Sequence, residues 1–113
     1  MLARELWRGS PERVRTALAT RRSDAPLEAL LAADGRWREA QAELEAAKAE
    51  RNRGSKEVGK LFAAGQRADG EALRGQMAAL GERIATVESA AEALAAEVAA
   101  LELQLPNLPH PSV

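Results

Sequence analysis

The feature that most constrains this 113-residue chain is a run of regularly spaced apolar residues in its C-terminal third. Spacings of four and three alternate through ten consecutive positions: Leu73, Met77, Leu80, Ile84, Val87, Ala91, Leu94, Val98, Leu101 and Leu105. This is the a/d repeat of a coiled-coil helix. Only 3% of the residues are aromatic, which disfavours a β-sandwich or barrel. The pattern predicts an all-α protein.

A second, thinner heptad seam precedes this one. Its a positions are Leu30, Trp37, Leu44, Arg51 and Val58, and its d positions are Ala33, Ala40, Ala47, Gly54 and Leu61. Two seams of similar length, separated by a break that contains two glycines, predict a long antiparallel two-helix coiled-coil hairpin. Pairing Leu61 with Leu73 at the turn sets the register. Gly54 then lies opposite Leu80 and Ala47 opposite Val87, so that small side chains face large ones.

The expected organisation is a helical arm over residues 1–105 and a Pro-rich linker over residues 106–113. Within the arm we expect an N-terminal segment with a short helix (1–25), an ascending helix (26–61), a tip (62–72) and a descending helix (73–105). Ser10 can cap the short helix and Pro11 suits its first position. This helix should pack at the base of the hairpin. Prolines in the linker stop the descending helix, and we expect the natural chain to continue into another domain.

Charge is distributed unevenly, although the formal net charge is only −1. Residues 1–50 are balanced, residues 51–83 carry a net +3, and residues 84–113 carry four Glu and no Lys or Arg. A basic segment over residues 51–83 next to an acidic one over residues 84–113 is suited to binding a polyanionic partner. The candidate contacts to the anionic groups of such a partner are the basic residues Arg51, Arg53, Lys56, Lys60, Arg67, Arg74 and Arg83, and Asn52 and Ser55 are candidates for hydrogen bonds to it.

Other kinds of site find little support in this sequence. There is no Cys, the single His is His110 in the linker, and no glycine-rich phosphate loop is present. We therefore expect no catalytic residue, metal site or cofactor in this chain. Trp37 lies in the seam and is interpreted as a core residue. No apolar run is long enough to span a membrane and the N-terminus carries charge at once, so we expect a cytoplasmic protein.

Three stretches give the chain a specific resemblance to a known family. They are residues 6–15 (LWRGSPERVR), residues 49–60 (AERNRGSKEVGK) and residues 105–113 (LPNLPHPSV). In this order the chain resembles the N-terminal tRNA-binding arm of bacterial seryl-tRNA synthetases over nearly its whole length. Ser10, where Asn is usual, and Gly54, where a larger residue is usual, depart from the family pattern.

The resemblance implies a partner and a role. In this family the arm projects from a class II catalytic domain and grips the long variable arm and elbow of serine tRNA through its backbone. The enzyme is a homodimer that uses ATP and Mg²⁺, and it binds neither membrane nor DNA. A fragment without the catalytic domain is expected to be inactive. The alternative that the residues leave open is a coiled-coil module for protein–protein interaction or oligomerisation.

Overall fold

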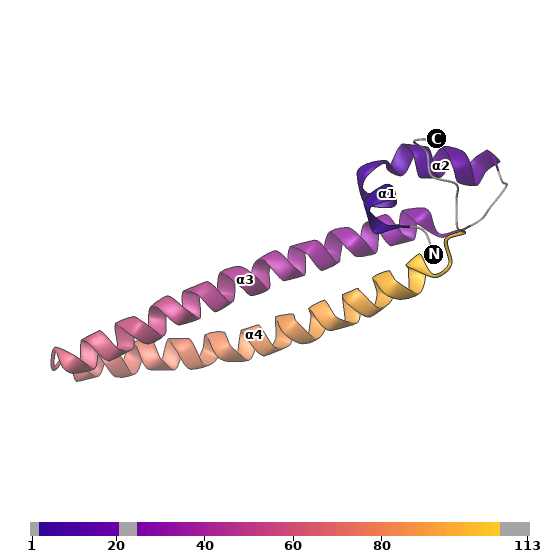
Figure 1. The fold of residues 1–113 in the computed structure, drawn as a ribbon. Helices are drawn as coiled ribbons and strands as arrows, with labels where there is room; N and C mark the ends of the chain where they lie inside the picture. The colour runs from indigo at the N-terminus through magenta and orange to yellow at the C-terminus, as the bar shows by residue number, and fades with distance from the viewer. Residues whose placement is uncertain (1–2, 21–24, 107–113) are drawn as a thin grey trace. The chain divides into compact units, whose positions relative to one another are not determined.

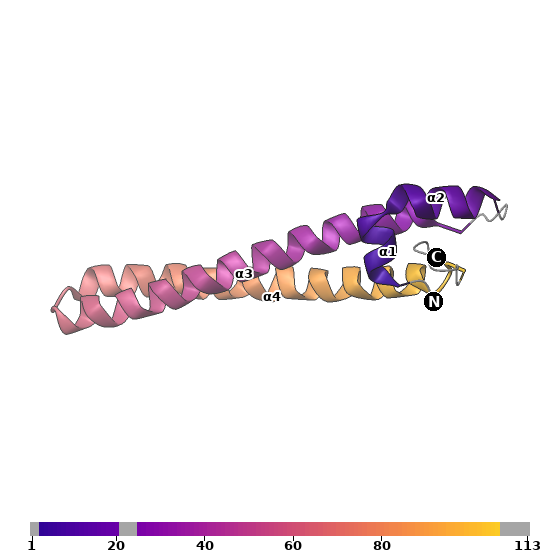
Figure 2. The ribbon, with the colours of Figure 1, turned by 45° about the horizontal axis from the view of Figure 1, so that its top comes forward.

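The computed structural model describes residues 3–20 and 25–106, and these residues form helices and connecting turns without a β-strand. The helices are α1 (Arg4–Gly9), α2 (Pro11–Thr20), α3 (Leu27–Ala63) and α4 (Arg67–Glu102). Figures 1 and 2 show α3 and α4 side by side and antiparallel. The predicted all-α class with a long two-helix hairpin is confirmed.

The N-terminal segment holds two short helices where the sequence predicted one. Helix α1 has only six residues, which is too short for periodicity to reveal or for intrinsic propensity to stabilise. Tertiary packing stabilises it, because Trp7 is fully buried. Pro11 opens α2 as predicted. Ser10 accepts hydrogen bonds through its carbonyl oxygen from the backbone N–H groups of Arg13 and Val14, at 3.1 and 3.3 Å, and its hydroxyl does not cap the helix.

The turn between α3 and α4 is much shorter than the predicted tip over residues 62–72. Only residues 64–66 are non-helical. Gly65 adopts φ 77°, its N–H donates to the Phe62 carbonyl at 3.1 Å, and the Gln66 N–H donates to the Leu61 carbonyl at 2.9 Å. These two bonds and the left-handed glycine form a Schellman motif, which ends α3 abruptly and lets α4 begin at Arg67.

The other predicted helix ends are close to the observed ones. Helix α3 begins at Leu27, directly after Pro26, whose carbonyl accepts from the Leu30 N–H at 3.0 Å. Helix α4 ends at Glu102, three residues before the predicted end at Leu105. The chain there tightens into i→i+3 turns, and Leu105 is still buried. The seam therefore continues for one layer beyond the helix. His110 lies outside the described residues.

The chain divides into two compact units, each with its own core. One unit contains the described parts of residues 1–37 and 93–113, and the other contains residues 38–92. Below they are called the stem unit and the turn unit. The stem core consists of Trp7, Val14, Leu18, Leu27, Leu30, Ala33, Val98 and Leu105. Trp37 packs against this core, as predicted. The turn core consists of Leu44, Ala47, Ile84 and Val87, with Leu80 packed against them.

The register within the turn unit differs from the predicted one by one core layer. Gly54 faces Met77 rather than Leu80: a Cβ at position 54 would meet the Met77 side chain, with Cε only 2.7 Å away. The shift follows from the short turn, because α4 starts six residues earlier than the predicted descending helix. The predicted contrast of small against large residues survives, since Gly54 now accommodates a methionine.

Candidate nucleic-acid interface

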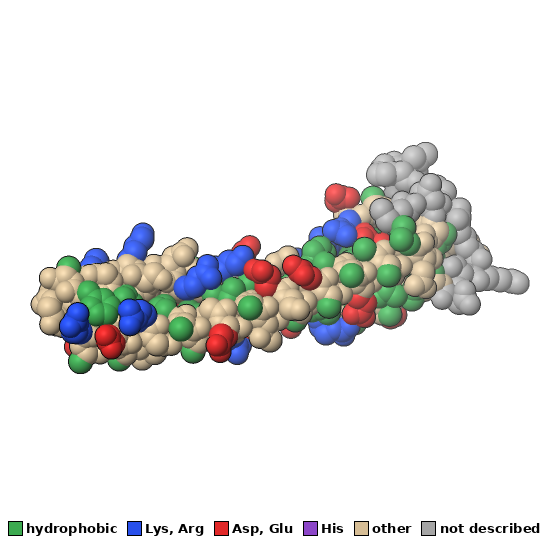
Figure 3. Space-filling model, turned by 90° about the horizontal axis from the view of Figure 1, so that it is seen from below, with side chains coloured by type: hydrophobic (Ala, Val, Ile, Leu, Met, Phe, Trp, Pro, Cys, Tyr) green, Lys and Arg blue, Asp and Glu red, His purple; other side chains and the backbone are tan. Residues whose placement is uncertain are grey.

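The predicted phosphate contacts lie together in the turn unit and reach solvent. Arg53, Lys56, Lys60, Arg67, Arg74 and Arg83 are exposed, as are Asn52 and Ser55. Arg51 is half-buried, as expected for an arginine at a seam position with its head group free to extend outward. Figure 3 shows Lys and Arg side chains projecting from the end of the hairpin that is farther from the grey atoms.

Most of these cations have no acidic partner among the described residues. Arg83 forms an ion pair with Glu43, and the Arg74 guanidinium lies over the Phe62 ring, 5.7 Å from its centroid. The remaining five take part in no ion pair or side-chain hydrogen bond within the described chain: Arg51, Arg53, Lys56, Lys60 and Arg67. Cations without local neutralisation are available to phosphate groups.

Arginines of the stem unit are engaged quite differently. Arg8 holds the buried Asp34 through both carboxylate oxygens, with Nε at 3.0 and 3.2 Å. Arg15 bridges to Glu28 and Glu12. Arg36 on α3 reaches Glu97 on α4 at 3.4 Å. Together with Arg4, which pairs with Glu102, four arginines of the stem unit are thus engaged with carboxylates of the same unit.

A buried polar cluster in the stem unit was not anticipated from the sequence. The Glu102 carboxylate accepts from Arg4 Nη2 at 2.7 Å and from Trp7 Nε1 at 3.2 Å. Trp37 lies between the helices with its indole N–H buried and without a hydrogen-bond partner, and the Arg4 guanidinium is 5.2 Å from its ring centroid. Hydrogen bonding to Arg4 lowers the pKa of Glu102 below its usual range. This cluster joins α1 to α4 and fixes the stem.

The two buried carboxylates of the stem unit share a signal in the heptads. Asp34 directly follows the d-position Ala33, and Glu102 directly follows the d-position Leu101. Such e positions normally face solvent in a two-helix hairpin. A third helix that covers them buries them, and its arginines then neutralise them. The burial of these carboxylates could have been predicted from two features of the sequence: acidic residues at e positions of the seams, and an N-terminal segment that carries arginines.

The turn unit has two polar flanks, one on each side of the seam, which the observed cross-helix contacts identify. Glu43 and Arg83, both at heptad position g, meet on the first side. On the other side the e-position residues Lys48 and Glu88 approach to 3.5 Å. Arg74 and Phe62, also at e positions, lie on that second side. We call the first side, at positions c and g, the Arg53 flank, and the second, at positions b and e, the Arg74 flank.

The candidate RNA contacts divide between these flanks. The Arg53 flank carries Arg53, Lys60 and Arg83, but also Glu43, Glu50 and Glu57. A shallow hollow of about 370 Å³ opens on it, lined by Glu50, Arg53, Gly54, Glu57, Leu73, Gln76 and Met77. The Arg74 flank carries Asn52, Ser55, Arg67 and Arg74, with Glu71 between the two arginines. Lys56, at position f, points away from the partner helix.

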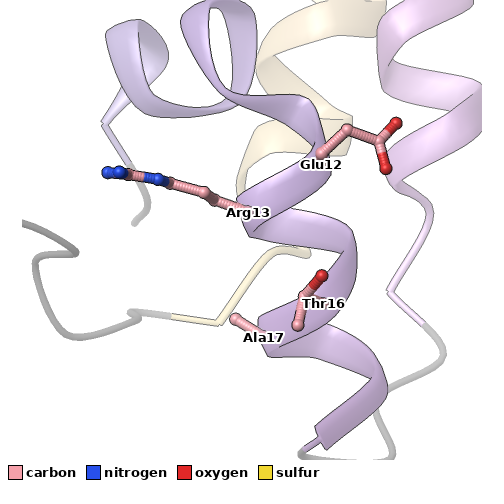
Figure 4. Close-up of a pocket in the computed structure, with 4 residues that line it drawn as sticks. All are labelled: Glu12, Arg13, Thr16 and Ala17. Atoms are coloured by element: carbon pink, nitrogen blue, oxygen red, sulfur yellow. The ribbon is translucent and has the colours of Figure 1, made fainter.

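A second hollow, of about 470 Å³, lies along α2 in the stem unit. Its lining residues are Glu12, Arg13, Thr16 and Ala17, and Figure 4 shows the head groups of Glu12 and Arg13 pointing in different directions. Convergent polar groups are what a catalytic or ligand site requires, and these four side chains do not converge. Among residues 3–20 and 25–106, no group of three or more His, Cys, Asp or Glu side chains is placed to hold a metal ion.

The fold and the site together define a helical-hairpin domain that presents unneutralised cations near its turn. Residues 1–109 match the family described as "Seryl-tRNA synthetase N-terminal domain". The chain belongs to this family, as its sequence resemblance predicted. No helix in the described part of the chain is long and apolar enough to cross a membrane.

Curated relatives carry the same family signal. The chain is 42% identical over 113 residues to a serine–tRNA ligase of Oleidesulfovibrio alaskensis, covering 100% of this chain and 26% of that protein. It is 42% identical to a serine–tRNA ligase of Thermomicrobium roseum, covering 25% of that protein. A serine–tRNA ligase of Halobacterium salinarum is 37% identical over 109 residues. The chain spans about a quarter of the length of these relatives.

Proposed function

We propose that this chain is the tRNA-binding arm of a serine–tRNA ligase. The observation that carries the proposal is the set of five turn-unit cations without acidic partners among the described residues, in a member of the seryl-tRNA synthetase N-terminal domain family. Arg51, Arg53, Lys56, Lys60 and Arg67 supply a positive surface that the stem arginines, already engaged with carboxylates, cannot supply.

In the proposed role the turn unit grips the long variable arm and elbow of serine tRNA. Contacts to phosphates and 2′-hydroxyls recognise the shape of RNA rather than its base sequence. Arg74 and Arg83 contribute to the same field, and Asn52 and Ser55 donate hydrogen bonds. The stem unit, fixed internally by Arg4, Arg8 and their carboxylates, holds the hairpin rather than the RNA.

The remainder of the proposed enzyme supplies the chemistry. A class II catalytic domain following the linker over residues 106–113 would activate serine with ATP and Mg²⁺ and transfer it to tRNA held by the arm, within a homodimer. Neither ATP nor Mg²⁺ is assigned to this chain, which we expect to be inactive by itself. We propose a cytoplasmic location, as for other components of translation.

Binding of purified RNA to the chain tests this function. Fluorescence anisotropy compares a labelled serine tRNA transcript with a tRNA of similar length that has a short variable arm. We expect tighter binding of serine tRNA, with a difference of about tenfold or more in Kd at about 150 mM salt. Equal affinity for both would contradict the proposal. Self-association without RNA selectivity, measured by sedimentation, would instead support the coiled-coil interaction module.

A further inference from the structure

Phe62 occupies a position that the coiled coil does not use. It lies at heptad position e, outside the a/d seam, and belongs to neither core cluster. Its half-buried ring packs on the backbone of Gly70, where a Cβ would lie 3.1 Å from Cε2 and 3.2 Å from Cζ. Gly70 is buried by this contact. The missing side chain at position 70 therefore lets the ring settle against α4 and fixes its orientation.

Arg74 forms a cation–π pair with this ring. Its guanidinium carbon is 5.7 Å from the Phe62 ring centroid, and the side chain is exposed and has no carboxylate partner among the described residues. Arg67 lies one heptad earlier on the same flank. In Figure 3, basic side chains stand on both sides of a hydrophobic patch at the end of the hairpin farther from the grey atoms.

We propose that Phe62 and Arg74 form a platform on which an unpaired base of the bound RNA stacks. The proposal rests on the proposed RNA-binding function and adds to it a contact with a base, where the cations contact phosphates. Unstacked bases in RNA loops commonly stack on aromatic rings and on guanidinium planes. Arg67 and Ser55 on the same flank can hold the adjoining phosphate and sugar.

The surroundings favour RNA over a protein as the occupant. A partner helix needs a stripe of exposed apolar side chains. Within the described residues the large exposed hydrophobic side chain is Leu103, which belongs to the stem unit. The turn unit offers instead one aromatic ring among cations. The Arg74 flank is also less acidic than the Arg53 flank, where Glu50 and Glu57 accompany Arg53.

The test uses the full 113-residue chain and a serine tRNA transcript at several salt concentrations. Phe62→Leu removes the ring and keeps the apolar volume, whereas Phe62→Tyr keeps the ring. Arg74→Lys keeps the charge and removes the guanidinium plane. Arg36→Lys is its matched control, because Arg36 pairs with Glu97 in the stem unit and is not a proposed RNA contact. We expect Phe62→Leu to weaken binding about tenfold with an unchanged salt slope. Arg74→Lys should also weaken binding, whereas Phe62→Tyr and Arg36→Lys should stay within about twofold of the wild type.

Other results would overturn the platform. Wild-type affinity in both Phe62→Leu and Arg74→Lys, with circular dichroism showing intact helices, would remove the stacking contact and leave selectivity for serine tRNA untouched. Equal affinities of Arg74→Lys and the Arg36→Lys control would show that the guanidinium plane of Arg74 has no role. If the wild type bound serine tRNA and the short-armed tRNA equally, the proposed function would be contradicted instead. The platform would still be tested in that case, by whether Phe62→Leu weakens binding of both RNAs.

Discussion

Arg4 and Glu102, which are 98 residues apart in the sequence, form a bidentate ion pair with Nε–Oε2 at 3.0 Å and Nη2–Oε1 at 2.7 Å. The Glu102 side chain is 4% exposed and that of Arg4 38%. A third hydrogen bond, donated by Trp7 Nε1 to Oε2 at 3.2 Å, also holds the buried carboxylate. One acidic residue at the end of α4 thus determines where α1 packs within the stem unit.

Glu102→Gln should destabilise the stem unit by about 1–3 kcal/mol. The neutral amide cannot accept the charge-assisted hydrogen bonds from Arg4. Its NH₂ group would also face the Arg4 guanidinium, which only donates, and would be left buried without an acceptor. Glu97→Gln on the same helix is the control. Its ion pair with Arg36 is exposed on both sides, so its removal should cost about 0.5 kcal/mol or less. Urea unfolding followed by tryptophan fluorescence reports the difference, and equal effects of the two substitutions would refute a special role for Glu102.

The stability that Glu102 contributes should disappear in acid. Its folded-state pKa is lowered from 4.5, mainly by the hydrogen bond from Arg4. A lowered folded pKa means that the contribution is complete above the unfolded pKa and is lost as the pH falls through the folded one. Wild type and Glu102→Gln should therefore differ at about pH 7 and converge progressively below pH 4.5. A gap in unfolding free energy that stays constant down to about pH 2.5 would contradict this.

Much of the fold was predictable because apolar spacing determines which helix faces meet. The seam positions Ile84 and Val87 are buried as expected, but the register is displaced by one layer. Periodicity cannot see the Schellman motif at Gly65, which depends on two specific backbone bonds. Gly70 is one of the two glycines in the predicted break between the seams, yet it lies within α4, where the Phe62 ring covers it. Packing across the turn outweighed the intrinsic helix propensity of glycine.

The candidate site was likewise predictable only in part from the sequence. Exposure of cations such as Lys56 and Lys60 follows from their heptad positions, so the sequence predicted it. Which of them share a flank with Phe62 depends on how the two helices pair. Burial of Asp34 and Glu102 depends on α1, whose six residues carry no periodic signal. Local patterns therefore predict surfaces, whereas neighbours brought in by the fold decide which charges are neutralised.

Glycine substitutions should separate helix propensity from packing in α3. Gly59→Ala places a Cβ in open space and should raise the unfolding free energy of the turn unit by about 0.5–1 kcal/mol. Gly54→Ala has the same advantage in propensity but must displace the Met77 side chain, so its stabilisation should be smaller or absent. Chemical denaturation of both variants measures the contrast. Equal stabilisation would show that Met77 does not occupy the space beside Gly54.

Engineered cysteines should report the register of the turn unit directly. A chain with Cys at positions 54 and 77 should form an intramolecular disulfide on mild oxidation, because the side chain at 77 lies against the backbone of Gly54. A chain with Cys at positions 54 and 80, the pair that the predicted register brings together, is the matched control. The chain has no native Cys that could interfere in either variant. The control should oxidise more slowly. Preferential bridging of 54 and 80, measured by gel mobility under non-reducing conditions, would restore the register with Leu61 opposite Leu73.

Salt dependence should distinguish phosphate-binding cations from those engaged within the protein. Lys56 and Lys60 have no ion pair among the described residues, so each phosphate that they neutralise releases counterions from the RNA. Replacing both by Ala should weaken binding of serine tRNA. It should also reduce the slope of log Kd against log salt by about one for each phosphate that is no longer neutralised.

Arg36→Ala provides the matched control, because Arg36 already contacts Glu97 at 3.4 Å in the stem unit. Its removal should leave both the affinity and the salt slope near their wild-type values. Anisotropy titrations between about 50 and 200 mM salt span the range in which phosphate binding changes affinity strongly. A double Lys variant with weakened binding but an unchanged slope would show that Lys56 and Lys60 do not neutralise phosphates. The weaker affinity would then arise from hydrogen bonding or packing on the outer face of α3.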